Sequence, residues 1–157
     1  MTCTIISNRA ELQLECKNEN EMPYCGIKFE LYQIIMQLYQ KGYDTFYVNG
    51  EYGIPLWAAE IICRLKSSHD ITLNIAIPHE EQSTNWVEEF RDRYFQVQLL
   101  ADSVTFVNTQ YSSECYQEAD DYMIQNSDLL YVFGRKQDCP DTVDTAKELK
   151  VEILYAW

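Results

Sequence analysis

Six short segments of the chain are nearly continuous in hydrophobic residues and rich in β-branched and aromatic side chains. They read TCTIIS (2–7), TFYVN (45–49), ITLNIAI (71–77), SVTFVN (103–108), LLYVFG (129–134) and VEILYAW (151–157). A half-exposed strand alternates apolar and polar residues, so continuous apolar runs favour strands that are buried on both faces of a parallel sheet. The pattern therefore predicts a mainly parallel sheet of about six strands.

Helical patterns separate these segments. Residues 27–39 place their apolar side chains on one face, after Pro23 and before Gly42, which suit the start and the end of a helix. Four further helices are predicted over 58–65, 83–101, 112–126 and 141–150, with Ser83 or Thr84 as the cap of the second of these. Strands that alternate with helices from end to end indicate one Rossmann-like, doubly wound α/β domain over 1–157.

Charge and composition narrow the function. The formal net charge of -13 opposes binding to DNA, RNA or an anionic membrane, because affinity for nucleic acid comes largely from Lys and Arg. No apolar run approaches the length of a membrane helix, and we read the opening MTCTIIS as a strand rather than an export signal. The six cysteines and two histidines lack the spacing of a zinc site, so we expect a soluble, cytoplasmic protein with mostly structural thiols and no metal or cofactor.

The candidate ligand site lies at the carboxyl ends of the strands, where open α/β sheets bind their ligands. The residues predicted there are Ser7, Asn8, Arg9, Asn49, Gly50, Glu51, Tyr52, Gly53, Pro78, Glu80, Gln82, the segment 108–111, Gly134 and Arg135. On the helix that follows Gly53, Trp57 is a candidate for stacking or packing. Glu60 is predicted to point toward the turn at Gly50, where its carboxylate would bind a ribose hydroxyl or act on a glycosidic bond. We expect His79 to be a surface or partly buried histidine outside the site.

The order of several longer motifs resembles one known group of proteins. TCTIISNRAEL, GYDTFYVNGEYGIPLWAAEI, IAIPHEEQSTNW, YMIQNSDLLYVFG and TVDTAKELKVEI span nearly the whole chain. They resemble the YpsA-like branch of the SLOG superfamily, a Rossmann-like group that includes the LOG phosphoribohydrolases and DprA. In that branch the first strand typically ends in Gly-His-Arg, the second in Gly-Gly-x-x-Gly before a Trp-Ala-Ala-Glu helix, and the third in Pro-Phe followed by Gln and Trp. The matching residues here are Arg9, Gly50, Gly53, Trp57, Ala58, Ala59, Glu60, Pro78, Gln82 and Trp86.

The chain departs from this pattern at three turns. Ser7 and Asn8 replace the first Gly and His, and Asn49 stands where a glycine is usual. After the fifth strand the resemblance implies a glycine-rich turn whose backbone N–H groups bind phosphate, but the chain reads GRKQDCPDTVDTAKE. One register places the turn on Gln137, Asp138 and Cys139, and the other replaces its three glycines by Asp141, Thr142 and Asp144. Neither register keeps a glycine, so we expect the phosphate cradle to be lost there and partly kept at Gly50 and Gly53.

These residues favour noncatalytic binding of a nucleotide-derived small molecule, for sensing or sequestration. The alternatives are a LOG-like nucleoside monophosphate phosphoribohydrolase and a protein-interaction or regulatory module whose ligand pocket has decayed. The resemblance also implies a helix-mediated homodimer or a higher homo-oligomer. The polar segment 8–26 is either a lid over the site or a solvated loop.

Overall fold

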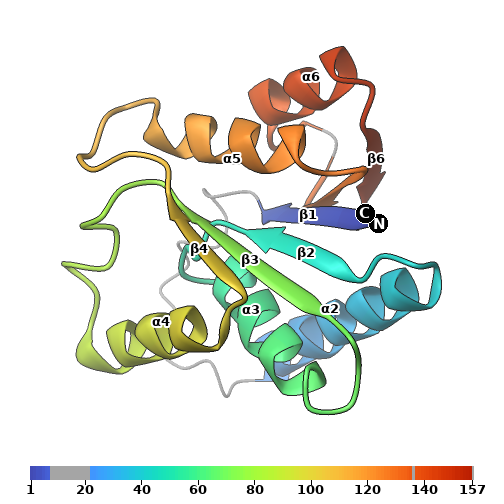
Figure 1. Cartoon of the computed structure of the whole chain (residues 1–157), viewed down its shortest axis with the longest axis horizontal. Coiled ribbons are helices and arrows are strands. Elements are labelled where there is room, and N and C mark those ends of the chain that lie inside the picture. Colours follow the sequence, from blue (N-terminus) through green and yellow to red (C-terminus); the bar gives the residue numbers. More distant parts are fainter. Residues whose placement is uncertain (8–21, 136, 157) are drawn as a thin grey trace.

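A computed structural model of the chain describes residues 1–7, 22–135 and 137–156. Its centre is a parallel sheet of six strands in the order β4-β3-β2-β1-β5-β6 (Figure 1). The strands are β1 (Thr2–Ser7), β2 (Thr45–Val48), β3 (Thr72–Ile77), β4 (Ser103–Phe106), β5 (Leu129–Phe133) and β6 (Glu152–Tyr155). Every pair of neighbours is parallel, so all the strands end at the same edge of the sheet.

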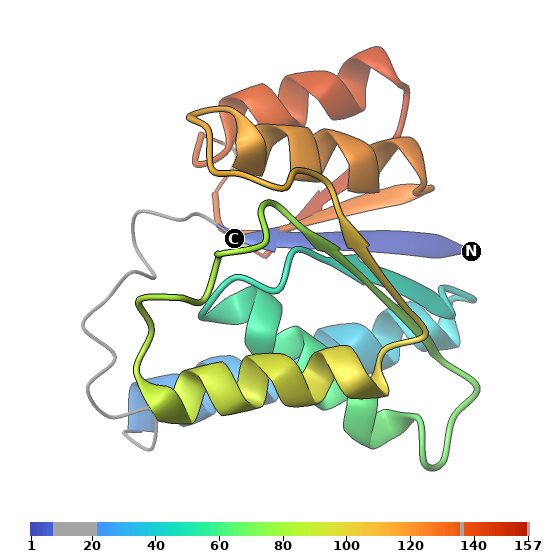
Figure 2. The ribbon, with the colours of Figure 1, turned by 60° about the vertical axis from the view of Figure 1, so that its left-hand side comes forward.

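Helices cover both faces of the sheet (Figures 1 and 2). One face carries α2 (Met22–Gln40), α3 (Ile54–Leu65) and α4 (Glu88–Leu100), and the other carries α5 (Cys115–Gln125) and α6 (Pro140–Glu148). From β1 to β4 each new strand is added outward, and the chain then returns through α5 to place β5 on the other side of β1. The strand order therefore reverses between β1 and β5, and the helices that follow these two strands diverge to opposite faces.

The core is densest around α3. Eight of its twelve residues are buried, and Ala58 and Ala59 have no exposed surface, so their small side chains let the helix lie close to the sheet. Every residue of β5 is buried, as the continuous apolar run predicts for a strand that has neighbours on both sides. Central strands and α3 thus form the rigid support from which the turns at the carboxyl edge project.

The expected fold class is confirmed, and the strand boundaries agree with the predicted ones within three residues. The helix predicted from Ser83 is shorter, however, because α4 begins at Glu88 with Val87 as its N-cap and without a side-chain cap. Ser83 is buried, and its carbonyl accepts a turn hydrogen bond from the N–H of Trp86 at 3.1 Å. The predicted lid segment, 8–26, lies outside the described residues except for 22–26, which form the start of α2 rather than an irregular stretch. Within the part of the chain that the structure describes, no helix is long and apolar enough to cross a membrane.

Candidate functional site

Open α/β sheets bind their ligands at the carboxyl ends of the strands between which the strand order reverses, which are β1 and β5 in this chain. Ser7, the last residue of β1, pairs in register with Phe133 of β5. The Cys139 thiol, just before α6, contacts the Ser7 carbonyl at 3.7 Å between Sγ and O. Ser7 and Gly134 therefore lie at the edge where they were predicted. Asn8 and Arg9 are outside the described residues, so their part in the site stays a prediction.

The turn between β2 and α3 is held by its own side chains. Asn49 is buried, and its Oδ1 accepts a hydrogen bond from the Glu51 N–H at 3.0 Å. Gly50 has φ +71°, and Gly53, the N-cap of α3, has φ +100°. A Cβ atom at Gly50 would lie 3.3 Å from side-chain atoms of both Ile75 and Tyr94. The fold itself therefore requires a glycine at position 50, whatever ligand the turn binds.

Gln82 connects this turn to the next elements. Its Nε2 donates to the Asn49 carbonyl at 3.3 Å, and its Oε1 accepts from the Tyr94 hydroxyl of α4 at 3.1 Å. Burial raises the pKa of Tyr94, which keeps that hydroxyl a donor at physiological pH. Gln82 is buried with both ends of its amide engaged, so it positions the β2–α3 turn. Of the other residues predicted near it, Pro78 is buried and Glu80 is exposed.

The turn between β5 and α6 contains a carboxylate where the resemblance implies a phosphate. The Asp138 Oδ2 accepts a hydrogen bond from the Arg135 N–H at 2.5 Å. A Cβ atom at Gly134 would lie 2.9 Å from the same oxygen, so this carboxylate covers the turn closely. The Arg135 residue is exposed. A backbone N–H group that could bind a ligand's phosphate is thus already hydrogen-bonded to an anionic side chain.

His79, which follows β3, is more buried than the sequence indicated. It is 8% exposed, and its Nδ1 is buried without a hydrogen-bond partner among the residues that the structure describes. The rings of Tyr111 and Tyr116 meet its imidazole edge-on, with centroids at 5.5 and 6.1 Å. Tyr111 was predicted at this edge, but Tyr116 and the burial of His79 were missed. The available signal was a pair of tyrosines shortly after the fourth strand, opposite the only histidine that follows a strand end.

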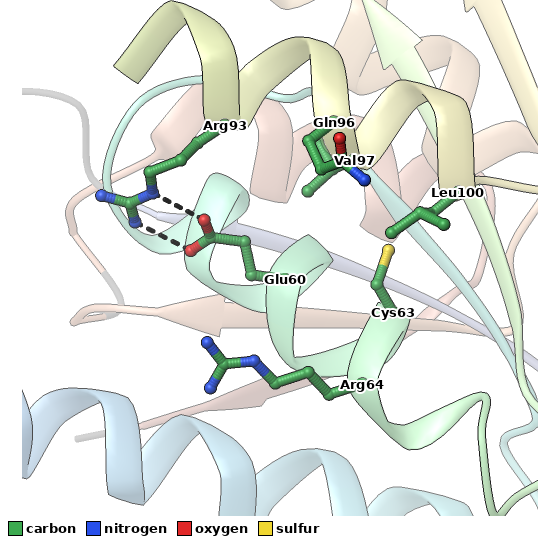
Figure 3. A pocket seen from close by; sticks show the side chains of 7 residues that line it. All are labelled: Glu60, Cys63, Arg64, Arg93, Gln96, Val97 and Leu100. Carbon is green, nitrogen blue, oxygen red and sulfur yellow. Dashed lines mark hydrogen bonds and ion pairs between the residues drawn. The ribbon is translucent and has the colours of Figure 1, made fainter. Parts of the chain in front are cut away.

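The prediction for the orientation of Glu60 is wrong. Its carboxylate points to α4 and forms a bidentate ion pair with Arg93, with Nε–Oε1 and Nη2–Oε2 distances of 2.6 and 2.8 Å (Figure 3). Both side chains are about three-quarters buried, with exposed fractions of 24% for Glu60 and 23% for Arg93. The rotation of each residue along α3 decides this direction, because position 60 faces the neighbouring helix rather than the turn at Gly50.

The ion pair lines a cavity of 230 Å³ between α3 and α4. The lining residues, shown in Figure 3, are Glu60, Cys63, Arg64, Arg93, Gln96, Val97 and Leu100. Burial raises the pKa of the Cys63 thiol to about 11, so the thiol stays protonated and is a poor nucleophile at neutral pH. All of the lining residues belong to the two helices, so this cavity is separate from the turns at the carboxyl edge.

Trp57 is a core residue. Its side chain is 1% exposed, the ring of Tyr24 packs edge-on against it at 6.1 Å, and Lys28 Nζ lies 4.9 Å from its centroid. Both partners belong to α2, so Trp57 joins α2 to α3. Of its two expected roles, packing is therefore the one with observed contacts.

Comparisons with known proteins agree with this fold. The family model named YpsA, described as the YspA SLOG family, matches residues 8–150. UPF0398 protein lmo1889 of Listeria monocytogenes is 31% identical over 150 residues, which cover 92% of this chain and 82% of the relative. UPF0398 protein BH1768 of Halalkalibacterium halodurans is 32% identical over 125 residues, or 78% of this chain. The match spans only 65% of BH1768.

Two solved structures are similar in fold. The X-ray structure of TM1055 superposes with a TM-score of 0.59 at 12% identity, over 97% of this chain and 71% of that one. DNA processing protein A from Helicobacter pylori, whose structure concerns its single-stranded DNA binding mode, gives a TM-score of 0.60 at 11% identity, over 99% of this chain and 64% of that one. At these identities the likeness concerns the fold alone.

Proposed function

The chain belongs to the YspA SLOG family, and from this membership and the geometry of its carboxyl edge we propose that it binds a nucleotide-derived small molecule without hydrolysing it. The supporting observation is the glycine turn at Gly50 and Gly53, which leads directly into the N-terminus of α3 at the same edge as the carboxyl ends of β1 and β5. A helix N-terminus favours the negative or polar groups of such a ligand.

The geometry of Glu60 argues against LOG-like hydrolysis. A carboxylate that acts on a glycosidic bond must reach the bond, and that of Glu60 is held between α3 and α4 by two charge-assisted hydrogen bonds from Arg93. Glu60 therefore joins α3 to α4 in our proposal.

The β5–α6 turn supports the same conclusion. Hydrolysis of a nucleoside monophosphate uses the binding energy of the remote phosphate to orient the reacting centre. Here the Arg135 N–H is taken by Asp138, and a second anion beside that carboxylate would be repelled. The proposed ligand is consequently bound through its base and sugar more than through a terminal phosphate at this turn.

Nucleic acid is not part of the proposal. Single-stranded DNA binding is named for the protein from Helicobacter pylori, but this chain has 25 acidic residues against 12 basic ones. A chain of this charge lacks the cations whose contacts with phosphates supply most of the affinity for DNA. The homo-oligomer that the resemblance implies stays a prediction, which light scattering during size-exclusion chromatography tests.

A thermal-shift panel of nucleosides, nucleotides, ADP-ribose derivatives and cyclic dinucleotides tests the proposal. A ligand at about a hundred times its dissociation constant stabilises the folded state by about 2.7 kcal/mol, which raises Tm by roughly 5–10 °C for a chain of this size. We expect Arg9→Ala to abolish the shift. Lys41→Ala, which removes an exposed charge from the end of α2 at the opposite edge, is the matched control and keeps the shift.

Two assays separate binding from its alternatives. Incubation with AMP and related monophosphates should release no base; release that Glu60→Gln abolishes would instead identify a hydrolase. Asp138→Ala should raise the affinity for a phosphorylated ligand relative to its unphosphorylated form, whereas Asp141→Ala, an equal charge change at an exposed position of α6, should not. Absence of any shift across the whole panel would favour the interaction module with a decayed pocket.

A further inference from the structure

His79 contains a buried polar atom that the described part of the fold leaves unsatisfied. More than nine-tenths of buried polar groups in proteins are hydrogen-bonded, so each exception calls for an explanation. The Nδ1 of His79 has no partner among the described residues, although only 8% of the residue is exposed. The other histidine, His69, shows the ordinary case, because its Nδ1 lies 2.8 Å from the hydroxyl oxygen of Ser68.

The position of His79 joins it to the candidate ligand site. It directly follows Pro78 at the end of β3, and its carbonyl accepts a hydrogen bond from the Gln82 N–H at 3.2 Å. Gln82 in turn bonds to the Asn49 carbonyl beside Gly50. The backbone of His79 is therefore linked through Gln82 to the same turn that opens α3.

Aromatic rings from the β4–α5 region surround the imidazole. Tyr116, in the first turn of α5, and Tyr111, just before the helix, both meet it edge-on. Tyr111 is 70% exposed, so its ring presents a large apolar face to solvent. Such a side chain can rotate at low cost and let a ligand reach the imidazole beneath it. The exposed ring of Tyr111 beside an unsatisfied polar atom offers both a stacking surface and a hydrogen bond.

We propose that His79, Tyr111 and Tyr116 form a subsite for the planar heteroaromatic base of the ligand. This inference rests on the proposed function and assigns one part of the ligand to one part of the edge. The base stacks on the tyrosine rings, and a donor or acceptor on its rim hydrogen-bonds with His79 Nδ1. Binding thereby satisfies the atom that the free protein leaves unpaired.

The chemistry of the surroundings selects a base over other ligand groups. An aliphatic group would leave Nδ1 unpaired, and only a flat ring makes full contact with an aromatic side chain. An anionic group would be opposed by the carboxylates of Glu80 and Glu81, which are exposed and directly follow His79. A neutral nucleobase has both the flat face and the polar rim.

Titration calorimetry tests the subsite. The probes are nucleosides that share a ribose and differ in base, and ribose 5-phosphate, which has no base. His79→Phe keeps a ring of similar size and removes both nitrogens. We expect it to weaken binding of the preferred nucleoside about ten-fold, the equivalent of one lost hydrogen bond, and to leave ribose 5-phosphate unaffected. Tyr111→Ala, at an exposed position, should weaken binding of the same nucleoside without affecting the fold.

His69→Phe is the matched control, because His69 also packs edge-on against a tyrosine, Tyr39, but lies at the opposite edge of the sheet. It should bind every probe as the unmodified protein does. The chain has only two histidines, so long-range proton–nitrogen spectra resolve both imidazoles. A base-containing probe should shift the nitrogen resonances of His79 and leave those of His69 in place.

The failures of the two proposals are distinguishable. If the unmodified protein binds nucleosides or nucleotides and His79→Phe binds them equally well, the subsite is wrong and the proposed function stands. Binding of ribose 5-phosphate that His79→Phe weakens as much as nucleoside binding would also overturn the subsite, because the imidazole would then recognise the sugar phosphate. If no probe binds even at millimolar concentration, the proposed function fails and the subsite fails with it.

Discussion

Replacing Gly50 by alanine measures how much the glycine in the β2–α3 turn contributes to the stability of the fold. The substitution adds one methyl group to a residue with φ +71°. A residue with a side chain is disfavoured in this left-handed region by about 1–2 kcal/mol. The new methyl carbon would also lie 3.3 Å from Ile75 Cγ2 and from Tyr94 Cε2.

Neither neighbour can move away freely. The Ile75 and Tyr94 side chains are 1% and 2% exposed, and Tyr94 is held by its hydrogen bond to Gln82. Adding a methyl group to a well-packed core costs about 1–3 kcal/mol. The lower entropy of the unfolded alanine chain offsets about 0.4–1 kcal/mol. We therefore expect Gly50→Ala to lower the free energy of unfolding by about 2–4 kcal/mol.

Gly42→Ala is the matched control, since Gly42 also has a positive φ, +95°, in the turn after α2. A Cβ atom there would meet only the Met1 Cε atom, at an ordinary contact distance of 3.5 Å. We expect a loss of about 1 kcal/mol, due to the backbone conformation alone. Urea denaturation gives both values, and Tm should fall by about 2–4 °C for each kcal/mol. Equal losses for the two variants would show that Ile75 and Tyr94 do not crowd the turn.

Three further predictions concern charges and the orphan nitrogen. A double-mutant cycle of Glu60→Gln and Arg93→Met should give a coupling energy of about 1–2 kcal/mol, which lies between the values for exposed and for fully buried ion pairs. A coupling energy near zero would mean that the ion pair does not form in solution. His79→Phe should raise the free energy of unfolding of the ligand-free protein by about 1 kcal/mol, because it removes a buried unsatisfied atom. A loss of stability in thermal unfolding would instead show that the imidazole makes a hydrogen bond within the fold. Burial opposes the ionisation of Asp102, but hydrogen bonds from Lys66 and a backbone N–H outweigh it and hold its pKa below the usual range. The charged form thus stabilises the fold above about pH 4, so the stability advantage over Asp102→Asn should shrink as the pH falls below that value, and an advantage independent of pH would contradict the reasoning.

The sequence alone predicts the fold class, because strand and helix patterns are local properties of the chain. Continuous apolar runs belong to strands with neighbours on both sides, and β5 is an example in which all five residues are buried. The glycines at 50 and 53 mark a turn from strand to helix whatever lies around them, since their positive φ angles are unfavourable for other residues. The edge at which the site residues lie follows from the parallel direction of the strands.

The start of α4 shows where local reasoning reaches its limit. A polar Ser83 before an apolar periodic segment predicts a cap, but the segment that follows β3 first makes turns and buries Ser83. The neighbouring Gln82 hydrogen-bonds with the Asn49 carbonyl, 33 residues away, and such tertiary contacts of this segment outweigh the local preference.

Two features of the site, the partner of Glu60 and the burial of His79, were decided only by the tertiary structure. Glu60 faces Arg93, 33 residues away, since the rotation and neighbours of α3 select its partner from the chain's twelve basic residues. The hydrogen bond from the Arg135 N–H to the Asp138 carboxylate, by contrast, spans only three residues and is a local feature of the β5–α6 turn. The burial of His79 depends on two tyrosines that the β4–α5 connection brings across the end of β3. A sequence pattern records which residues face the core, whereas the direction of a polar side chain depends on which partner the packed elements bring within hydrogen-bond distance.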